Sequence, residues 1–245
     1  MADILIVVPA RGGSKRLPGK NIRPLAGRSL IAHTAEAIAD SKLVAPVLLT
    51  TDDEAIAEEG RRYNMQVPFL RPAHLAGDAA PTADTVLHAL DWFRDDTGAD
   101  PEMVMVLQPT SPLRGGDCLR TSVELLAQQP NANSIIAMTI LHLSPLALFQ
   151  EDGAGFLKPL SDDNCRPVYA PNGALYLTRT AGLRAEHSVY ADPIVPLVMD
   201  PQRSIDIDTP ADWDLALALL AAGPSDAPAK KADSGSAPSF RNSVV

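Results

Sequence analysis

The sequence predicts an α/β fold with a mostly parallel central sheet. Short apolar runs rich in β-branched residues alternate along the chain with stretches whose apolar residues recur at helical spacing. This alternation is typical of βαβ units, whose strands pair in parallel. The chain has 245 residues, 46% of them hydrophobic, which is enough for one large domain with an aliphatic core.

Each expected element has a local signal. The run Ile4-Leu5-Ile6-Val7-Val8 is apolar and β-branched, which predicts a buried strand that Pro9 ends. Ser29 is the expected N-cap of the first helix, and Asp52 is the expected N-cap of the second. The expected strands lie at 4–8, 46–51, 103–107, 134–141, 172–177 and 193–199, with a weaker one at 67–70, and the expected helices lie at 29–40, 53–63, 83–94, 116–128 and 210–220.

The composition divides the chain into one domain and a tail. Residues 1–222 carry the strand and helix patterns, with an irregular stretch at about 140–170. From Gly223 onward Pro, Ser, Ala, Lys and Asp dominate, and core-forming residues are nearly absent. Residues 223–245 are therefore predicted to be a disordered tail.

Charge and cysteine content exclude several classes of function. A net charge of −9 argues against nucleic acid as a partner. The two cysteines, Cys118 and Cys165, have neither metal-ligand spacing nor the pattern of a disulfide scaffold. The start of the chain lacks a signal peptide, and no apolar run is long enough to span a bilayer. We therefore expect a cytoplasmic protein without a membrane partner.

The most informative stretch is residues 11–21, directly after the first strand. Arg11, Lys15, Arg16 and Lys20 surround three glycines in this loop. Turning backbone amides and basic side chains together suit a polyphosphate. The spacing fits neither the G-x-x-x-x-G-K-[ST] loop of ATPases nor the G-x-G-x-x-G dinucleotide motif. The alternative for this loop is a basic surface turn without a ligand.

Two further segments add chemistry to this site. Gln108 follows the strand at 103–107, at the sheet edge where ligands bind in open α/β folds, and its amide can read a pyrimidine edge. Asp206 and Asp208 are two residues apart, so on an extended segment they face the same side while Ile207 faces the core. Two convergent carboxylates suit Mg²⁺, and helix capping is the alternative role for Asp208.

The loop resembles the signature of the CMP-sugar synthetases of the acylneuraminate cytidylyltransferase type. Five further stretches match this family in order, over nearly all of residues 1–220. The resemblance implies a Rossmann-like, GT-A-like three-layer sandwich with a small dimerisation extension at about 140–170, and hence a homodimer. The matching stretches are 9–21, Thr50-Thr51-Asp52-Asp53, Phe69-Leu70-Arg71-Pro72, Leu107–Arg114, Pro171-Asn172-Gly173-Ala174 and Ser204–Thr209.

The resemblance also implies roles for single residues. Nucleotide contacts are expected from the loop, from two residues between the strands at 46–51 and 103–107, and from the residue that follows the strand at 103–107. The expected nucleotide-binding residues are Ala10, Arg11, Gly12, Gly13, Ser14, Lys15, Asn21, Arg71, Thr82 and Gln108; the sugar-binding residues are Gln108, Lys158 and Asn172; the catalytic residues are Arg11, Lys20, Asp208 and Arg166; and the metal ligands are Asp206 and Asp208.

One segment departs from the family pattern. The family usually has an Arg-Gln pair ahead of its Asn-Gly motif, whereas this chain has Asp162-Asp163-Asn164 there. Arg166 is close but offset, and Ala170 stands before Pro171 where an arginine is common. Either Arg166 takes the role through a loop shift, or the sugar contacts differ.

The resemblance implies that CMP passes from CTP to the anomeric hydroxyl of a nonulosonic, sialic-type acid, with release of pyrophosphate, for cell-surface glycan biosynthesis in a lipopolysaccharide or capsule. Three alternatives remain. They are a nucleotidyltransferase for a Kdo-type or other sugar, a glycosyltransferase on a similar nucleotide-binding fold, and a non-catalytic nucleotide-binding paralogue. The Lys20-Asn21 end of the loop and the Asp-Ile-Asp pattern argue against the Kdo branch.

Overall fold

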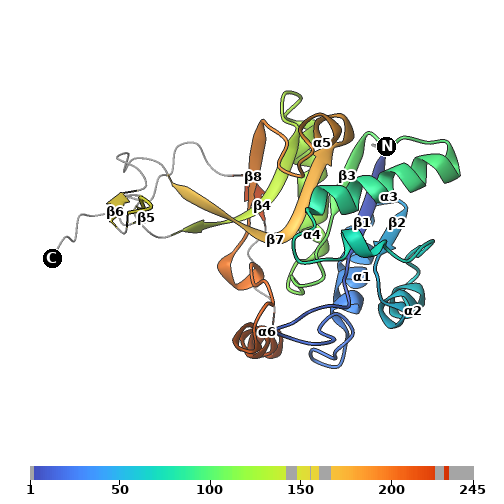
Figure 1. The fold of residues 1–245 in the computed structure, drawn as a ribbon, viewed down its shortest axis with the longest axis horizontal. Coiled ribbons are helices and arrows are strands. Elements are labelled where there is room, and N and C mark those ends of the chain that lie inside the picture. The colour runs from blue at the N-terminus through green and yellow to red at the C-terminus, as the bar shows by residue number, and fades with distance from the viewer. Residues whose placement is uncertain (1–2, 142–147, 155, 160–166, 224–228, 232–245) are drawn as a thin grey trace.

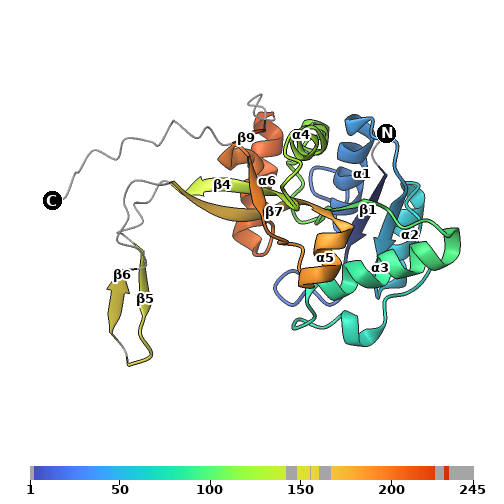
Figure 2. The same ribbon diagram turned by 90° about the horizontal axis from the view of Figure 1, so that it is seen from above.

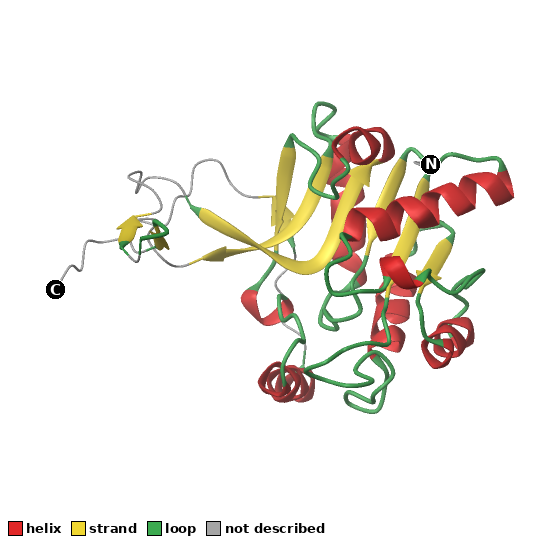
Figure 3. Cartoon of the chain, in the orientation of Figure 1, coloured by secondary structure: helices red, strands yellow, loops and turns green. Residues whose placement is uncertain are grey.

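The computed structural model describes residues 3–141, 148–154, 156–159, 167–223 and 229–231. The described chain forms a seven-stranded sheet covered by helices on both faces, and a separate two-stranded hairpin (Figures 1 and 3). The strands are β1 (Ile4–Pro9), β2 (Val47–Thr50), β3 (Met103–Val106), β4 (Ser134–Leu141), β5 (Phe149–Glu151), β6 (Leu157–Pro159), β7 (Val168–Arg179), β8 (Ile194–Val198) and β9 (Lys230–Lys231). The helices are α1 (Leu30–Ser41), α2 (Glu54–Arg62), α3 (Thr82–Thr97), α4 (Gly116–Ala127), α5 (Thr180–Glu186) and α6 (Pro210–Ala222), with short 3₁₀ turns at Ala73–Leu75 and Pro201–Arg203.

The strand order in the sheet is β2-β1-β3-β7-β4-β8-β9. β1 pairs in parallel with β2 and β3, and β4 pairs in parallel with β8. β7 is antiparallel to both β3 and β4, so those two strands run in the same direction as β1. The predicted mostly parallel α/β fold is therefore confirmed, with β7 inserted in reverse at the centre.

Alternating side chains of the strands supply two core layers. On β1, Ile4, Ile6 and Val8 pack in one cluster with α1 and α4, whereas Leu5 and Val7 pack in the other with α3. These five side chains are almost completely buried. Figure 2 shows α1 and α4 on one face of the sheet and α3 and α5 on the opposite face. A strand buried on both faces has to be apolar throughout, which is why its sequence shows no polar alternation.

Of the two predicted helix caps, one agrees with the structure and one differs. The Ser29 hydroxyl accepts a hydrogen bond from the Ala32 amide and caps α1, as predicted. The prediction for Asp52 was wrong, because Asp53 accepts from the Ile56 amide and caps α2. Asp52 instead accepts a hydrogen bond from the Gly12 amide at 2.9 Å. The residue expected to begin the second helix thus contacts the cationic loop.

Two other expectations need correction. The stretch at 67–70 is not a strand; single bridges join Gln66 to Leu48 and Leu70 to Thr51. The tail is not wholly separate from the domain, because β9 pairs with β8 and Ala229 is buried against the core. Residues 224–228 and 232–245 of the predicted tail lie outside the described residues.

The hairpin of β5 and β6 lies within the predicted extension at about 140–170. It stands away from the main sheet, beyond the ends of β4 and β7, in both views of the ribbon (Figures 1 and 2). Its side chains at Phe149, Phe156 and Leu157 are 56%, 70% and 68% exposed. Apolar side chains this exposed on a projecting element indicate a contact surface rather than a core.

Candidate active site

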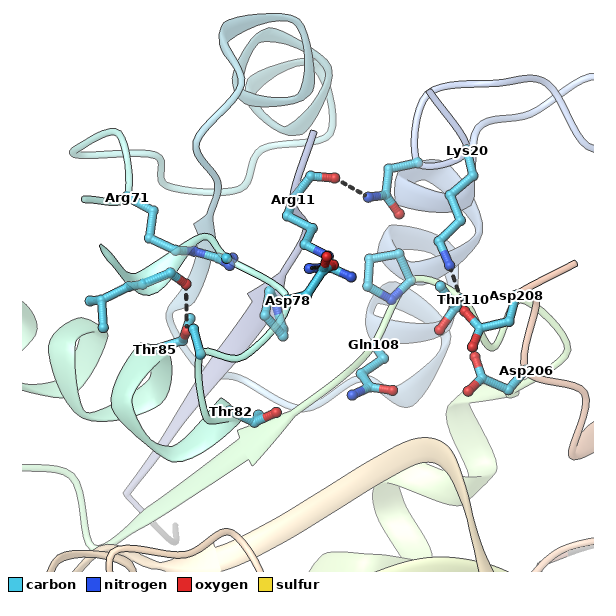
Figure 4. A pocket seen from close by; sticks show the side chains of 16 residues that line it. Arg11, Lys20, Arg71, Asp78, Thr82, Thr85, Gln108, Thr110, Asp206 and Asp208 are labelled. Carbon is cyan, nitrogen blue, oxygen red and sulfur yellow. Dashed lines mark hydrogen bonds and ion pairs between the residues drawn. The ribbon is translucent and has the colours of Figure 1, made fainter. Parts of the chain in front are cut away.

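A cavity of about 370 Å³ opens at the carboxyl ends of β1 and β3. These two strands are neighbours in the sheet, so the loop after Pro9 and the residues after Val106 meet at the same edge. Figure 4 shows charged and polar side chains converging on this cavity from several segments. They include Arg11, Lys20, Arg71, Asp78, Thr82, Gln108, Thr110, Asp206 and Asp208.

The cationic loop between β1 and α1 is held in shape at both ends. Asn21 donates a hydrogen bond from its Nδ2 to the Arg11 carbonyl at 3.0 Å. Leu17 is buried in a third cluster together with Trp213 of α6. Gly12 leaves no room for a side chain, because a Cβ there would lie 2.7 Å from the Asp53 carboxylate. The loop is thus pre-shaped around its cations, as an anion-binding site requires.

A second cavity of about 210 Å³ adjoins the first and lies within this loop. Arg11, Lys20, Asp78 and Asp208 line both cavities. Of the other predicted loop residues, Asn21 lines the larger cavity, Ser14 and Lys15 line the smaller one, and Ala10 is buried beneath the loop. Concentrated cations in a small hollow suit a chain of phosphates.

Lys20 and Asp208 form the best-buried ion pair of the cavity wall. The Lys20 Nζ donates to Asp208 Oδ1 at 2.9 Å and to the Ile207 carbonyl at 2.8 Å, and its side chain is only 12% exposed. Arg16 donates to the other carboxylate oxygen of Asp208 at 2.9 Å. The hydrogen bond from Lys20 lowers the pKa of Asp208 below its ordinary value. Asp208 is therefore ionised at neutral pH.

Asp206 faces the same cavity, and Figure 4 shows the two carboxylates beside each other. Partial desolvation by the surrounding protein raises the pKa of Asp206, although the side chain still contacts water in the open cavity. Ile207 between them is fully buried, and its amide donates to the Thr110 carbonyl at 2.8 Å. The predicted alternation of this segment is confirmed.

The alternative role of Asp208 as a helix cap does not hold. Thr209 caps α6, and its hydroxyl and the Asp212 carboxylate complete a capping box. The structure thus assigns capping to the neighbouring residues and leaves both Asp206 and Asp208 on the cavity.

The donor set fits Mg²⁺. This ion prefers oxygen ligands and usually takes one or two carboxylates, with water and substrate phosphates completing its octahedron. Asp206 and Asp208 supply two such groups in one wall. Among the described residues no cluster of three or more His, Cys, Asp or Glu side chains could hold a metal by itself. Binding of the ion would therefore depend on the phosphates of a ligand.

Arg71 and Gln108 occupy the opposite wall and the floor. Arg71 is buried and donates to the hydroxyl and carbonyl of Thr50 at the end of β2, with 3.1 Å to the hydroxyl. Burial lowers its pKa to about 10, so the guanidinium remains charged at neutral pH.

Gln108 lies with its Oε1 against Gly173. The backbone of Gly173 has a positive φ of 74°, and its surroundings leave no room for a side chain. Thr82, at the first turn of α3, completes this wall.

Asn172 lies behind the cavity wall rather than in it. Its Nδ2 donates to the Ser204 hydroxyl at 2.9 Å, and its Oδ1 accepts from the Ala174 amide at 3.1 Å. The side chain is buried and thus shapes the turn that carries Gly173. The expected sugar contact would therefore have to arise from this turn and not from the Asn172 amide as it stands.

Two of the remaining predicted residues, Lys158 and Gly13, do not line the cavity. Lys158 lies on the projecting hairpin, where it pairs with Asp152 at 3.4 Å and is 73% exposed. Gly13 lies in the loop, and a Cβ built on it would meet no atom within 4 Å. Arg166 lies outside the described residues. Within the described residues, one copy of the chain therefore gathers most of the expected nucleotide-binding residues at the cavity but does not bring Lys158 there.

Two residues outside the predicted site set support the cavity, Arg114 in the structural role that the sequence indicated and Tyr176 without a sequence signal. Arg114 is buried and donates to the carbonyls of Gln108 and Ala174 at 3.1 and 2.6 Å. Tyr176 of β7 lines a further cavity of about 220 Å³ that shares Thr82 with the main one. Burial raises the pKa of Tyr176, so its hydroxyl stays protonated. In the sequence, a tyrosine within a buried strand looks like a core residue, so Tyr176 gave no sign that it would line a cavity.

Comparison with known proteins adds family information. The family described as Cytidylyltransferase matches residues 5–147, more than half of the chain. The CMP-N,N'-diacetyllegionaminic acid synthase of Legionella pneumophila is 38% identical over 226 residues, which cover 89% of this chain and 96% of that protein. The N-acylneuraminate cytidylyltransferase of Escherichia coli is 28% identical over 88% of this chain and 52% of its own length.

Solved structures with the same fold are also known. A CMP-2-keto-3-deoxy-manno-octonic acid synthetase in complex with CTP superposes with a TM-score of 0.67 at 18% identity, covering 90% of this chain and 99% of that one. The 4-diphosphocytidyl-2C-methyl-D-erythritol synthase of Anaerococcus prevotii gives a TM-score of 0.65 at 12% identity. At these identities the likeness concerns the fold alone.

Proposed function

This chain belongs to the cytidylyltransferase family, and we propose that it transfers CMP from CTP to the anomeric hydroxyl of a nonulosonic acid, with release of pyrophosphate. The observation that carries the proposal is the shared cavity, in which the cationic loop, Gln108 and the Asp206–Asp208 pair come together. Relatives named for legionaminic, neuraminic and pseudaminic acids favour this acceptor class over a Kdo-type sugar.

The phosphates of CTP would lie along the cationic loop. Arg11, Lys15, Arg16 and Lys20 supply four positive charges around the smaller cavity. These cations balance the charge of the triphosphate and of the departing pyrophosphate. The cytosine would then extend toward the wall formed by Arg71, Thr82 and Gln108, where an amide can offer both a donor and an acceptor.

The acceptor would enter from the side of β7. Gly173 brings the backbone close to both Gln108 and Asp206, and the cavity beside Tyr176 continues from Thr82. An acid held there presents its anomeric hydroxyl to the α-phosphate. The hydroxyl oxygen bonds to the α-phosphorus as the bond from that phosphorus to the bridging oxygen of the β-phosphate breaks. Pyrophosphate leaves, and the hydroxyl proton passes to water in the open cavity. Positioning and charge neutralisation by the chain are the main contributions.

Mg²⁺ is part of this proposal. Asp206 and Asp208 would hold the ion, and when bound it neutralises charge on the phosphate oxygens. Lys20 and Arg16 keep Asp208 ionised, which is the state that a metal ligand needs.

No helix among the described residues is long and apolar enough to cross a membrane. We place the reaction in the cytoplasm, where CTP is made.

The reaction is tested by following pyrophosphate release from CTP and Mg²⁺ with a panel of N,N'-diacetyllegionaminic, N-acetylneuraminic and pseudaminic acids and Kdo. We expect release with at least one nonulosonic acid, and no release without acceptor. Release with Kdo alone would assign the chain to the other sugar class. Formation of a nucleoside diphosphate would indicate a glycosyltransferase, and CTP binding without turnover on any acceptor would indicate a non-catalytic paralogue.

We also propose a homodimer formed through the hairpin of β5 and β6. Phe149, Phe156 and Leu157 expose apolar surface there, and Lys158 on the same hairpin does not reach the cavity of its own chain. A partner copy would cover the apolar side chains and bring cations such as Lys158 to the neighbouring acceptor site.

Light scattering of the wild type and of a Phe156→Ser, Leu157→Ser variant tests this arrangement. We expect a dimer for the wild type and a monomer for the variant, with weaker acceptor binding and unchanged CTP binding. The matched control is Leu215→Ser, which changes a 48% exposed leucine on α6 and should leave the dimer intact. A monomeric wild type would refute the proposed interface.

A further inference from the structure

Asp78 is a carboxylate that stands inside the cationic site. It follows the 3₁₀ turn at Ala73–Leu75 and precedes α3, and it lines the cavity directly against the loop cations Arg11 and Lys15. Its Oδ1 pairs with the Arg11 guanidinium at 2.6 Å, and its Oδ2 pairs with Lys15 Nζ at 2.6 Å. One carboxylate thus joins two cations of the loop across the opening.

The position of Asp78 coincides with the junction of the two cavities. Asp78 lines both the larger cavity and the smaller phosphate-sized one. Figure 4 shows its carboxylate at the Arg11 side chain, in the middle of the site. A phosphate chain that runs from the cavity floor into the loop has to contact the same cations that Asp78 holds.

We propose that Asp78 is an internal counter-anion that a ligand's phosphate chain must displace, and that it thereby lowers the affinity of the site for ligands whose phosphates reach Arg11 and Lys15, pyrophosphate included. This inference rests on the proposed function of the site. A triphosphate reaches Arg11 and Lys15 with several charges and replaces one carboxylate easily. A single α-phosphate does not reach this pair and leaves Asp78 in place.

Because Asp78, Arg11 and Lys15 are exposed, separating the carboxylate from the two cations costs little free energy. The side chains of Asp78, Arg11 and Lys15 are 49%, 39% and 80% exposed, so water screens their attraction. The Lys20–Asp208 pair differs, because its lysine is nearly buried. Asp78 can therefore leave the cations when phosphates arrive, whereas Asp208 stays.

The same contact acts in the reverse direction after the reaction. When pyrophosphate leaves, Arg11 and Lys15 regain Asp78 as a partner, so the free protein is stabilised relative to its pyrophosphate complex. Any interaction that stabilises only the free state lowers the affinity for the ligand by the same factor. Asp78 thus favours release of pyrophosphate.

The test is calorimetric titration of the full chain with CTP, CMP and inorganic pyrophosphate, for the wild type and Asp78→Asn. We expect the variant to bind pyrophosphate and CTP roughly two- to tenfold more tightly, with CMP binding unchanged. Asp95→Asn is the matched control, since it removes one negative charge from an exposed ion pair on α3 away from the cavity. Its affinities should equal those of the wild type.

A double-mutant cycle with Lys15→Gln sharpens the result. In the wild type the loss of Lys15 also relieves its pairing with Asp78, so the affinity for pyrophosphate should fall less than it does in the Asp78→Asn background. Equal losses in both backgrounds, or weaker pyrophosphate binding by Asp78→Asn with Mg²⁺ present, would overturn the inference while leaving CTP binding in place. A wild type that binds neither CTP nor pyrophosphate would instead refute the proposed function itself.

Discussion

Replacing Asp208 by asparagine is expected to lower the turnover of pyrophosphate release by about 10²- to 10³-fold while leaving the fold intact. Asparagine keeps the shape of the side chain but removes the charge that pairs with Lys20 and Arg16. The variant also loses one of the two carboxylates on the cavity that suit Mg²⁺. The expected loss is therefore in the chemical step rather than in stability.

The measurement is kcat at saturating CTP, acceptor and Mg²⁺, with a circular dichroism melt to confirm folding. Asp214→Asn is the matched control, because Asp214 is an exposed carboxylate on α6 that faces away from the cavity lining. Thr209 and Asp212 still cap α6 in the variant, so the helix should be retained. Turnover within threefold of the wild type would remove Asp208 from the mechanism.

The second large effect is expected from Arg114→Leu. Its guanidinium is buried at 3% exposure and donates to two carbonyls and to the Thr34 hydroxyl, joining the Gln108 segment, β7 and α1. Burial lowers its pKa to about 10, yet it stays charged at neutral pH. Leucine would remove three buried hydrogen bonds and the charge that joins these segments, which destabilises the fold by about 2–4 kcal/mol. The Gln108 carbonyl would keep the Ser111 amide as a donor, and the Thr34 hydroxyl would keep its bond to the Leu30 carbonyl.

Thermal unfolding measures this effect directly. A loss of that size should lower the melting temperature by roughly 5–15 °C for a domain of this length. The matched control is Arg120→Leu, which removes an exposed arginine that donates to one carbonyl, that of Asp40, at 2.8 Å. We expect the control to melt close to the wild type, and equal melting of both variants would show that Arg114 does not join the three segments.

Arg114 also has an expected effect on the site. It contacts the carbonyl of Gln108 and that of Ala174, on either side of the close approach between Gln108 and Gly173. Arg114→Lys keeps a charge but not the forked geometry, so it should restore part of the stability. If Arg114 positions Gln108, the lysine variant should retain kcat and show a raised KM for CTP.

The sequence by itself determined most strands and helices around the main sheet and the cationic loop after β1. Local signals suffice for these, because a helix or a strand reflects the side chains of neighbouring residues and their periodicity. Ser29 caps its helix through an amide three residues away, and Ile207 turns inward between two aspartates because a strand alternates. The motifs that carry the family resemblance are equally local stretches of sequence.

Only the tertiary structure decided which side chains those motifs bring together. Antiparallel β7 lies between β3 and β4 and so joins segments that are far apart in the sequence. In this position the Asn172 amide points to Ser204, and Gly173 lies against Gln108 and Asp206. Asp78 follows a loop without periodicity, and its pairing with Arg11 depends on how α3 packs on the sheet. Such contacts are set by packing between distant segments, which local backbone preferences do not encode.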